Sequence, residues 1–216
     1  PPRSTLFPYT TLFRSDGMIS PTRLVVLISG NGSNLQVILD ACQTGALSAQ
    51  VVAVFSNQPE AYGLERARRA GVPALAFPKT KDQDRRTYDS SLAAAIQNHQ
   101  PHWIILAGWM RLLSNAFLQH FPNQVINLHP ALPGKFPGTH AIERALAAFE
   151  QGQIEHTGVM VHLVPDEGID NGPVLNSIQV PILPTDTLAT LEARIHTAEH
   201  ALLIQVLKTL TAPNRV

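Results

Sequence analysis

The fold of this chain is decided by residues 24–35, which read LVVLISGNGSNL. The first five residues are all apolar, which predicts a strand buried on both faces, and the glycines after them predict a tight turn. From Leu35 to residue 41 the apolar residues recur at helical spacing. A buried strand, a glycine turn and a helix in this order are typical of the first unit of a parallel α/β sheet.

The same alternation continues along the chain. Further strands are predicted at residues 51–55, 74–77, 104–107 and 125–126, and further helices at residues 64–70 and 87–98. Residues 159–164 alternate between two faces and, with a strand at 174–180, predict an antiparallel edge; Leu188–Leu210 reads as a long amphipathic helix. We therefore expect an α/β fold: a mostly parallel twisted sheet with helices on both faces and an antiparallel C-terminal edge.

Length and charge narrow the class of protein. The 216 residues fit one large domain, and 16 basic residues balance 16 acidic ones, so we expect no nucleic-acid or membrane partner. The single cysteine, Cys42, excludes an internal disulfide framework and favours the cytoplasm. No apolar run approaches the roughly 20 residues that cross a bilayer. The histidine spacing matches no zinc motif, so we expect no metal.

The beginning of the chain has an unusual pattern. Thr-Leu-Phe at residues 5–7 recurs at 11–13, each time beside an Arg-Ser pair, with no helical or strand period. A signal peptide would need a continuous apolar segment and a small-residue cleavage site, which this stretch lacks. We interpret residues 1–17 as a disordered, non-native leader, Met18 as the native start, and residues 18–216 as a single domain.

The first glycine turn is a candidate anion site. Unpaired N–H groups at a helix start bind phosphate well, and we expect Ser33 and Asn34 to cap this helix. The turn lacks the third glycine of a dinucleotide fingerprint, and the second predicted strand ends in FSN at residues 55–57, without an acidic ribose ligand. A phosphate monoester therefore fits better than a dinucleotide. The alternative is a simple strand-to-helix turn.

Asn127 and His129 form the candidate reactive pair. Residues two apart in a strand point to the same face, so both side chains can be aimed at one group. An amide donates without titrating and an imidazole exchanges protons near neutral pH, which suits a carbonyl oxygen that becomes negative while a proton moves. The alternative is a local hydrogen-bonding role for the pair, and a structural role for His140, His156 and His162.

The loop PDEGIDNGP at residues 165–173 is acidic and turn-forming but does not match a calcium loop. It is either part of a site or a solvated connection between strands.

Arg85 and Arg111 lie beside the ends of predicted elements, where a guanidinium can bind a ligand carboxylate, although a surface position is the alternative. We interpret the three arginines of the helix predicted at residues 64–70 as solvated surface: Arg66, Arg68 and Arg69.

Six ordered segments together resemble the phosphoribosylglycinamide formyltransferases, a family of folate-dependent enzymes of purine biosynthesis. They are VLISGNGSNLQ at 26–36, VFSN at 54–57, GLERA at 63–67, LAGWMR at 106–111, INLHP at 126–130 and DNGP at 170–173. The resemblance runs from about Leu24 to about Leu210 and implies a Rossmann-like formyltransferase fold.

The resemblance implies a site with three parts and two small-molecule substrates. These are 10-formyltetrahydrofolate as formyl donor and the ribonucleotide as acceptor, with no metal, in a monomer or homodimer. The residues that the resemblance assigns to catalysis are Asn127, His129 and Asp170. Those that it assigns to binding the phosphate and ribose are Gly32, Ser33, Asn34 and Glu199. Those that it assigns to binding the folate are Arg85, Met110, Arg111, Leu112, Leu113, Asp166, Glu167, Gly168 and Ile169. Asp170, if close, is expected to raise the pKa of His129 by charge pairing.

The chain departs from the family pattern in two places. ALPG at residues 131–134 stands where the family usually has Ser-Leu-Leu-Pro, and the folate loop is about one residue longer, which leaves Asp166 as an alternative to Asp170.

Three other kinds of enzyme have a similar catalytic trio: methionyl-tRNA formyltransferase, formyltetrahydrofolate hydrolase and the sugar-nucleotide formyltransferases. The first would need a C-terminal RNA-binding domain and the second an N-terminal regulatory domain. The glycine turn favours the ribonucleotide enzyme, and a nucleotide-binding oxidoreductase is the alternative from another class.

Overall fold

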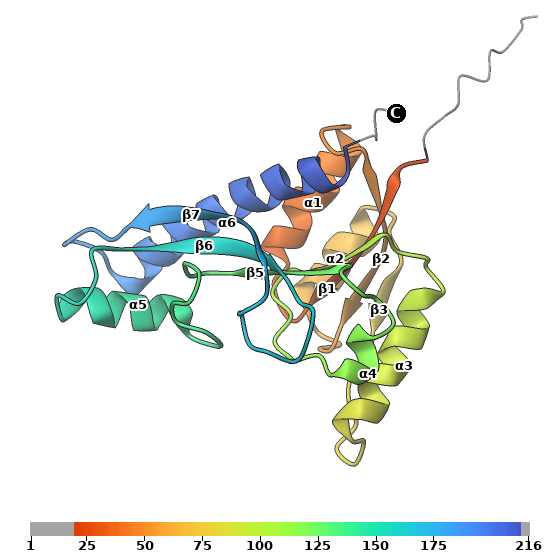
Figure 1. The fold of residues 1–216 in the computed structure, drawn as a ribbon. Coiled ribbons are helices and arrows are strands. Elements are labelled where there is room, and N and C mark those ends of the chain that lie inside the picture. Colours follow the sequence, from red (N-terminus) through yellow and green to blue (C-terminus); the bar gives the residue numbers. More distant parts are fainter. Residues whose placement is uncertain (1–19, 213–216) are drawn as a thin grey trace, which may run out of the picture.

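A seven-stranded sheet with the order β3-β2-β1-β4-β5-β6-β7 organises the protein in this computed structural model, which describes residues 20–212 (Figure 1). The first five strands run parallel, β6 is antiparallel to β5, and β7 is antiparallel to β6. Their bounds are β1 Thr22–Ile28, β2 Ala49–Ser56, β3 Ala74–Ala76, β4 Trp103–Leu106, β5 Val125–His129, β6 His156–Leu163 and β7 Val174–Pro181. The predicted mostly parallel sheet with an antiparallel C-terminal edge is confirmed.

Helices cover both faces of this sheet (Figure 1). Their bounds are α1 Ser33–Gln43, α2 Tyr62–Arg69, α3 Arg85–Gln97, α4 Asn115–Leu118, α5 Ala141–Glu150 and α6 Leu188–Leu210. Side chains of α1, α2, α5 and α6 pack in one apolar cluster, and those of α3 and α4 pack in the other. None of the helices within residues 20–212 combines the length and apolar character that crossing a bilayer requires.

Strand β1 shows why its sequence is apolar throughout. Leu24, Val26 and Ile28 belong to one cluster, whereas Val25 and Leu27 belong to the other, and all five side chains are fully buried. A strand between two helical layers has no solvent-facing side, so the usual polar alternation disappears.

The order of the strands places a crevice at the ends of β1 and β4. These two strands are neighbours, but β2 and β3 continue the sheet on one side and β5 to β7 continue it on the other. In open α/β sheets, ligands bind outside the carboxyl ends of the strands at such a reversal. The backbone joins the two halves there, since Ser29 N donates to Gly108 O at 3.0 Å.

Several local predictions need correction. Strand β5 runs through His129 and is longer than the strand predicted at residues 125–126. Helices α4 and α5 were not predicted, although the buried residues of α5 recur at helical spacing. Ser33 and Asn34 do not cap α1: the N-cap is Gly32, with φ of 76° and no side-chain cap bond. The predicted leader, residues 1–17, lies outside the described residues.

The packing of two glycines gives a stability prediction. A Cβ on Gly63 would overlap Ile28 Cδ1 and lie 3.2 Å from Gly32 Cα. We therefore expect Gly63→Ala to lower the free energy of unfolding by about 1–3 kcal/mol, the usual effect of overpacking. Urea unfolding measures this. Gly30→Ala is the matched control, because nothing lies within 4 Å of its added Cβ; equal stability of the two variants would contradict the prediction.

Candidate active site

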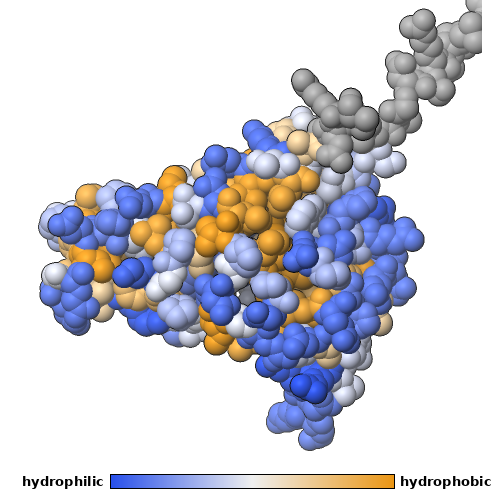
Figure 2. Space-filling view, in the orientation of Figure 1, coloured by the Kyte–Doolittle hydropathy of each residue, from blue (hydrophilic) through white to orange (hydrophobic). Residues whose placement is uncertain are grey.

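A cavity of about 700 Å³ opens at the carboxyl ends of β1, β4 and β5. Apolar residues gather at the middle of the face shown in Figure 2, whereas the surface over α3 is mostly hydrophilic. The structure brings every residue of the predicted site to the cavity wall except Arg85. These residues are Gly32, Ser33, Asn34, Met110, Arg111, Leu112, Leu113, Asn127, His129, Asp166, Glu167, Gly168, Ile169, Asp170 and Glu199.

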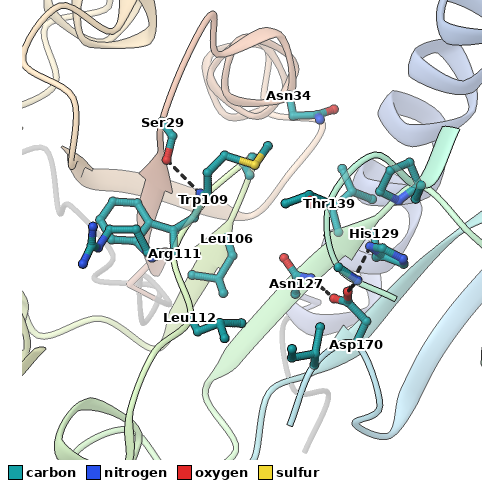
Figure 3. Close-up of a pocket in the computed structure, with 18 of the residues that line it drawn as sticks. Ser29, Asn34, Leu106, Trp109, Arg111, Leu112, Asn127, His129, Thr139 and Asp170 are labelled. Atoms are coloured by element: carbon teal, nitrogen blue, oxygen red, sulfur yellow. Dashed lines mark hydrogen bonds and ion pairs between the residues drawn. The ribbon is translucent and has the colours of Figure 1, made fainter. Parts of the chain in front are cut away.

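Asn127, His129 and Asp170 converge on one side of the cavity (Figure 3). The first two come from the same face of β5, and Asp170 comes from the loop between β6 and β7. Asn127 Nδ2 donates to Asp170 Oδ1 at 3.0 Å, and His129 Nδ1 lies 3.3 Å from Asp170 Oδ2. One carboxylate therefore contacts both an amide and an imidazole.

The Asp170 carboxyl is held in its ionised form. Burial opposes ionisation, but the contact with His162, the Gly138 N–H bond of 2.8 Å and the nearby histidines outweigh it, and the pKa of Asp170 falls below its ordinary value. An ionised carboxylate only accepts hydrogen bonds. It therefore also fixes the orientation of the Asn127 amide, whose nitrogen must face it.

His129 has a lower pKa than we expected. Its side chain is almost fully buried, and this desolvation lowers the pKa below its ordinary value of 6.5, although the charge of Asp170 and the carbonyl of Phe136 act in the opposite direction. Asp170 acts on this pKa in the predicted direction, but burial dominates and the net shift is downward. Phe136 O lies 3.1 Å from Nε2 and can only accept, so Nε2 carries a proton and the neutral ring has its lone pair on Nδ1.

His162 belongs to the same cluster, and sequence reasoning missed it. The antiparallel register places it directly opposite Asn127, with its Nε2 at 3.2 Å from Asn127 Nδ2 and 3.5 Å from Asp170 Oδ1. Its Nδ1 lies 2.8 Å from Leu163 O, which can only accept, so Nδ1 carries a proton. Only the pairing of β5 with β6 could have revealed this residue.

Backbone strain is concentrated around this cluster. Among the described residues, five residues other than glycine have positive φ, and Phe136, His140 and Asp170 are three of them, with φ of 44°, 57° and 50°. Such residues cost free energy and are found where surrounding contacts hold them, often at functional sites. Here Asp170 is held by the hydrogen bonds of its own carboxylate.

The opposite end of the cavity is formed by the first turn of α1. The N–H groups there have no partner within the helix, and the macrodipole makes this end positive. Asn34 Nδ2 donates to Glu199 Oε2 at 3.4 Å, and His196 Nδ1 lies 2.7 Å from the same oxygen. His196 was not predicted, although it stands one helical turn before Glu199 on α6 and lines the cavity.

A third wall is unusually apolar and exposed. Met110 is 70% exposed, Leu112 49% and Ile169 45%, and all three line the cavity. The first of them is anchored by its backbone, since its N–H donates to Ser29 Oγ at 2.8 Å (Figure 3). Arg111 stacks over the Tyr88 ring at 5.0 Å. Large apolar side chains left open beside polar groups are typical of a ligand surface.

Arg85 lies behind this wall instead of lining the cavity. Its Nη2 lies 3.4 Å from Glu167 Oε2, and its Nε lies 3.8 Å from Asp89 Oδ2. Both of these nitrogens are buried and lack a hydrogen-bond partner.

Of the two aspartates considered for the reactive cluster, the structure brings Asp170 to His129, whereas the carboxylate of Asp166 accepts from Gly168 N. Within residues 20–212, no group of three or more His, Cys, Asp or Glu side chains is arranged to hold a metal ion.

The fold and this cavity agree with the comparisons to known proteins. The family profile described as Formyl transferase matches residues 22–207, so the chain belongs to the formyl transferase family. Within that family, its relatives include phosphoribosylglycinamide formyltransferases. The protein of that name from Schizosaccharomyces pombe is 47% identical over 204 residues, covering 89% of this chain and 98% of the relative. The one from Dictyostelium discoideum is 44% identical over 201 residues, covering 87% and 97%.

A solved structure gives the same result. Glycinamide ribonucleotide transformylase 1 from Symbiobacterium toebii superposes with a TM-score of 0.83 at 40% sequence identity, covering 89% of this chain and 88% of that one. The family resemblance and the formyltransferase fold that the sequence predicted are both confirmed.

Proposed function

We propose that this protein transfers the formyl group of 10-formyltetrahydrofolate to the amine of 5-phosphoribosylglycinamide, a step of de novo purine biosynthesis. One observation carries the proposal: the Asn127, His129 and Asp170 cluster and the phosphate-binding turn of α1 open into the same cavity. The names of its relatives agree with it.

The acceptor lies with its phosphate at α1. The N–H groups of Ser33 and Asn34 bind the phosphate oxygens, assisted by the helix macrodipole. The Glu199 carboxylate, which is almost fully buried and already bonded to Asn34 and His196, accepts from the ribose hydroxyls. This pose directs the glycinamide amine across the cavity towards Asn127.

The formyl donor occupies the apolar wall. Met110, Leu112 and Ile169 supply surface for a flat aromatic ring system, and their exposure in the free protein is the area that such a ligand covers. Arg85 supports this wall from behind, because its guanidinium lies 3.4 Å from Glu167 Oε2.

Catalysis consists of direct attack and proton transfer. As the amine attacks the formyl carbon, the formyl oxygen becomes negative, and Asn127 donates to this oxyanion with the amide N–H that is not bonded to Asp170. Because burial lowers its pKa, His129 enters the reaction neutral and takes the proton that the amine loses. Asp170 stabilises the resulting imidazolium, which returns the proton to the departing folate nitrogen. Detection of a formylated enzyme would contradict direct transfer.

The proposal is tested by following folate absorbance with 10-formyltetrahydrofolate in the presence and absence of 5-phosphoribosylglycinamide. We expect turnover only when the ribonucleotide is present, with formylated ribonucleotide as the product. Equal turnover without the ribonucleotide would indicate a hydrolase, and turnover only with an amino-sugar nucleotide would indicate the sugar-nucleotide enzyme. Either result would overturn the assignment.

His196 makes the binding of the acceptor depend on pH. Its hydrogen bond to Glu199 raises its pKa above the ordinary value of 6.5, although burial opposes this. The ring is therefore cationic below that raised pKa and neutral above it. The substrate phosphate is already a dianion above its second pKa of about 6. We expect the KM for the ribonucleotide to increase as the pH rises through this raised pKa.

Steady-state kinetics across this pH range measure the effect. His196→Gln removes the titrating group, so its KM for the ribonucleotide is expected to be nearly independent of pH and to exceed that of the unmodified protein below the raised pKa of His196. His156→Gln is the control, because His156 is exposed on β6 away from this cavity. A pH profile of His196→Gln that still follows that of the unmodified protein would contradict the role of His196.

A further inference from the structure

The glycine loop that precedes α1 rests on the first turns of α2. Gly63 N donates to Gly30 O at 3.1 Å, and an added Cβ on Gly32 would lie 2.7 Å from Gly63 Cα. The two backbones are therefore in direct contact, and the loop has no room to move towards α2. One end of the loop is thus fixed by a main-chain bond to the neighbouring helix.

Arg66, one turn further along α2, holds the middle of the same loop. Its Nε donates to Asn31 O at 2.9 Å, and its Nη2 donates to Asn31 Oδ1 at 2.9 Å. Its Nη1 donates to Gln36 Oε1 on α1 at 3.1 Å. A planar guanidinium that binds two oxygens of one residue restrains both its side chain and its peptide group. The prediction that Arg66 is solvated surface is therefore wrong.

These bonds determine where the loop N–H groups point. In a trans peptide, the C=O and the following N–H lie on opposite sides. Because Gly30 O and Asn31 O are both directed to α2, the N–H groups of Asn31 and Gly32 are directed away from it. Asn31 and Gly32 line the cavity, and Gly32 has a left-handed φ of 76°. Successive N–H groups in such a turn form an anion-binding concavity.

Among the described residues, no carboxylate forms an ion pair with Arg66. Its three hydrogen bonds all go to neutral oxygens, and its guanidinium lies 4.9 Å from the centre of the Tyr62 ring. In contrast, both Arg68 and Arg69 form salt bridges with Glu65 on the same helix. The loop therefore has a positive charge directly behind it.

We propose that Arg66 is a positioning residue that makes the glycine loop selective for substrates with a phosphate monoester. It acts through Asn31, whose carbonyl it holds so that the next N–H faces the phosphate, and through its own uncompensated charge. The proposal rests on the proposed function for the identity of the acceptor, but its ligand chemistry is a sugar phosphate in either case.

The kinetic test compares Arg66→Met with Arg69→Met. The first keeps an apolar stem but removes all three hydrogen bonds, and the second removes a guanidinium bonded to Glu65 and Tyr62 instead of the loop. We expect Arg66→Met to raise the KM for the phosphorylated acceptor on the order of tenfold, as loss of a charged hydrogen bond does. Three constants of Arg66→Met are expected to stay within about twofold of the unmodified protein: kcat, the KM for the folate and the KM for the dephosphorylated acceptor. For Arg69→Met, kcat and all three KM values are expected to stay within the same range. An equal rise in KM for both acceptors would overturn the proposal.

A binding test separates this proposal from the proposed function. Ribose 5-phosphate and ribose are added separately to each protein, and the shift in melting temperature is measured. Ribose 5-phosphate is expected to raise the melting temperature of the unmodified protein and of Arg69→Met, with a much smaller rise for Arg66→Met; ribose is expected to raise none. Arg66→Lys, which offers one donor group in place of the fork, is expected to give an intermediate shift. Full stabilisation of Arg66→Met by ribose 5-phosphate would overturn the role of Arg66, whether or not the protein transfers formyl groups.

Discussion

Asp170→Asn is expected to reduce kcat by about 10³-fold, within the usual range for a general acid–base group, with little change in stability. The substitution removes the charge that stabilises a protonated His129, and it removes one of the acceptors that orient Asn127. Asparagine tolerates the left-handed backbone conformation that this position requires, with φ of 50°, so the loop is expected to keep its shape. Single-turnover kinetics measure the chemical step, and urea unfolding measures the stability.

Two further aspartate variants sharpen this experiment. Asp166→Asn, in the same loop, is expected to change the KM for the folate and to leave kcat within a few-fold. Asp82→Asn, at an exposed turn, is the matched control for the chemical change itself. If Asp166→Asn instead reduced kcat as much as Asp170→Asn, the catalytic role would not belong to Asp170 alone. Both aspartates would then take part in it.

Asn127→Ala is expected to reduce kcat by roughly 10²–10³-fold, the cost of losing one oxyanion donor, with a smaller effect on either KM. The amide is needed most when the formyl oxygen is negative, so its loss raises the barrier more than it weakens ground-state binding. Asn127 is only half-buried, and its removal leaves His162 Nε2 and Asp170 Oδ1 still in contact with each other at 3.5 Å. The fold is therefore expected to survive.

The control for Asn127→Ala is Asn176→Ala, which removes the same group from β7, away from the cavity wall. Its kcat is expected to match that of the unmodified protein. A loss of less than about fivefold in Asn127→Ala would remove this residue from the oxyanion role, because even one good donor accounts for more than that.

Much of the sheet could be predicted from the sequence, because its core strands are apolar on both faces. Residues such as Val25 and Val26 have no solvent-facing side, so a short apolar run sufficed to locate each central strand. The order of the strands was not predicted. Strand order depends on which pairs of strands meet across long stretches of chain, and a local pattern contains no such information.

The same reason explains which site residues were missed. Asn127 and His129 share a strand, so their common direction follows from local geometry. His162 joins them only through the antiparallel register of β5 and β6, and Arg66 contacts Asn31 only because α2 packs beside α1. The net pKa shift of His129 could not be predicted for a related reason, since it depends on the depth of burial, which no pairwise argument supplies.

The reversal of strand order between β1 and β4 has a consequence for how this scaffold can evolve. The glycine turn that we propose as the phosphate site follows β1, whereas Asn127 and His129 lie within β5, so the proposed acceptor site and the proposed reactive cluster come from opposite sides of one cleft. Substitutions in the turn after β1 therefore replace no residue of the cluster on β5. Enzymes with new amine acceptors can therefore diverge from such an ancestor while inheriting the same formyl-transfer apparatus.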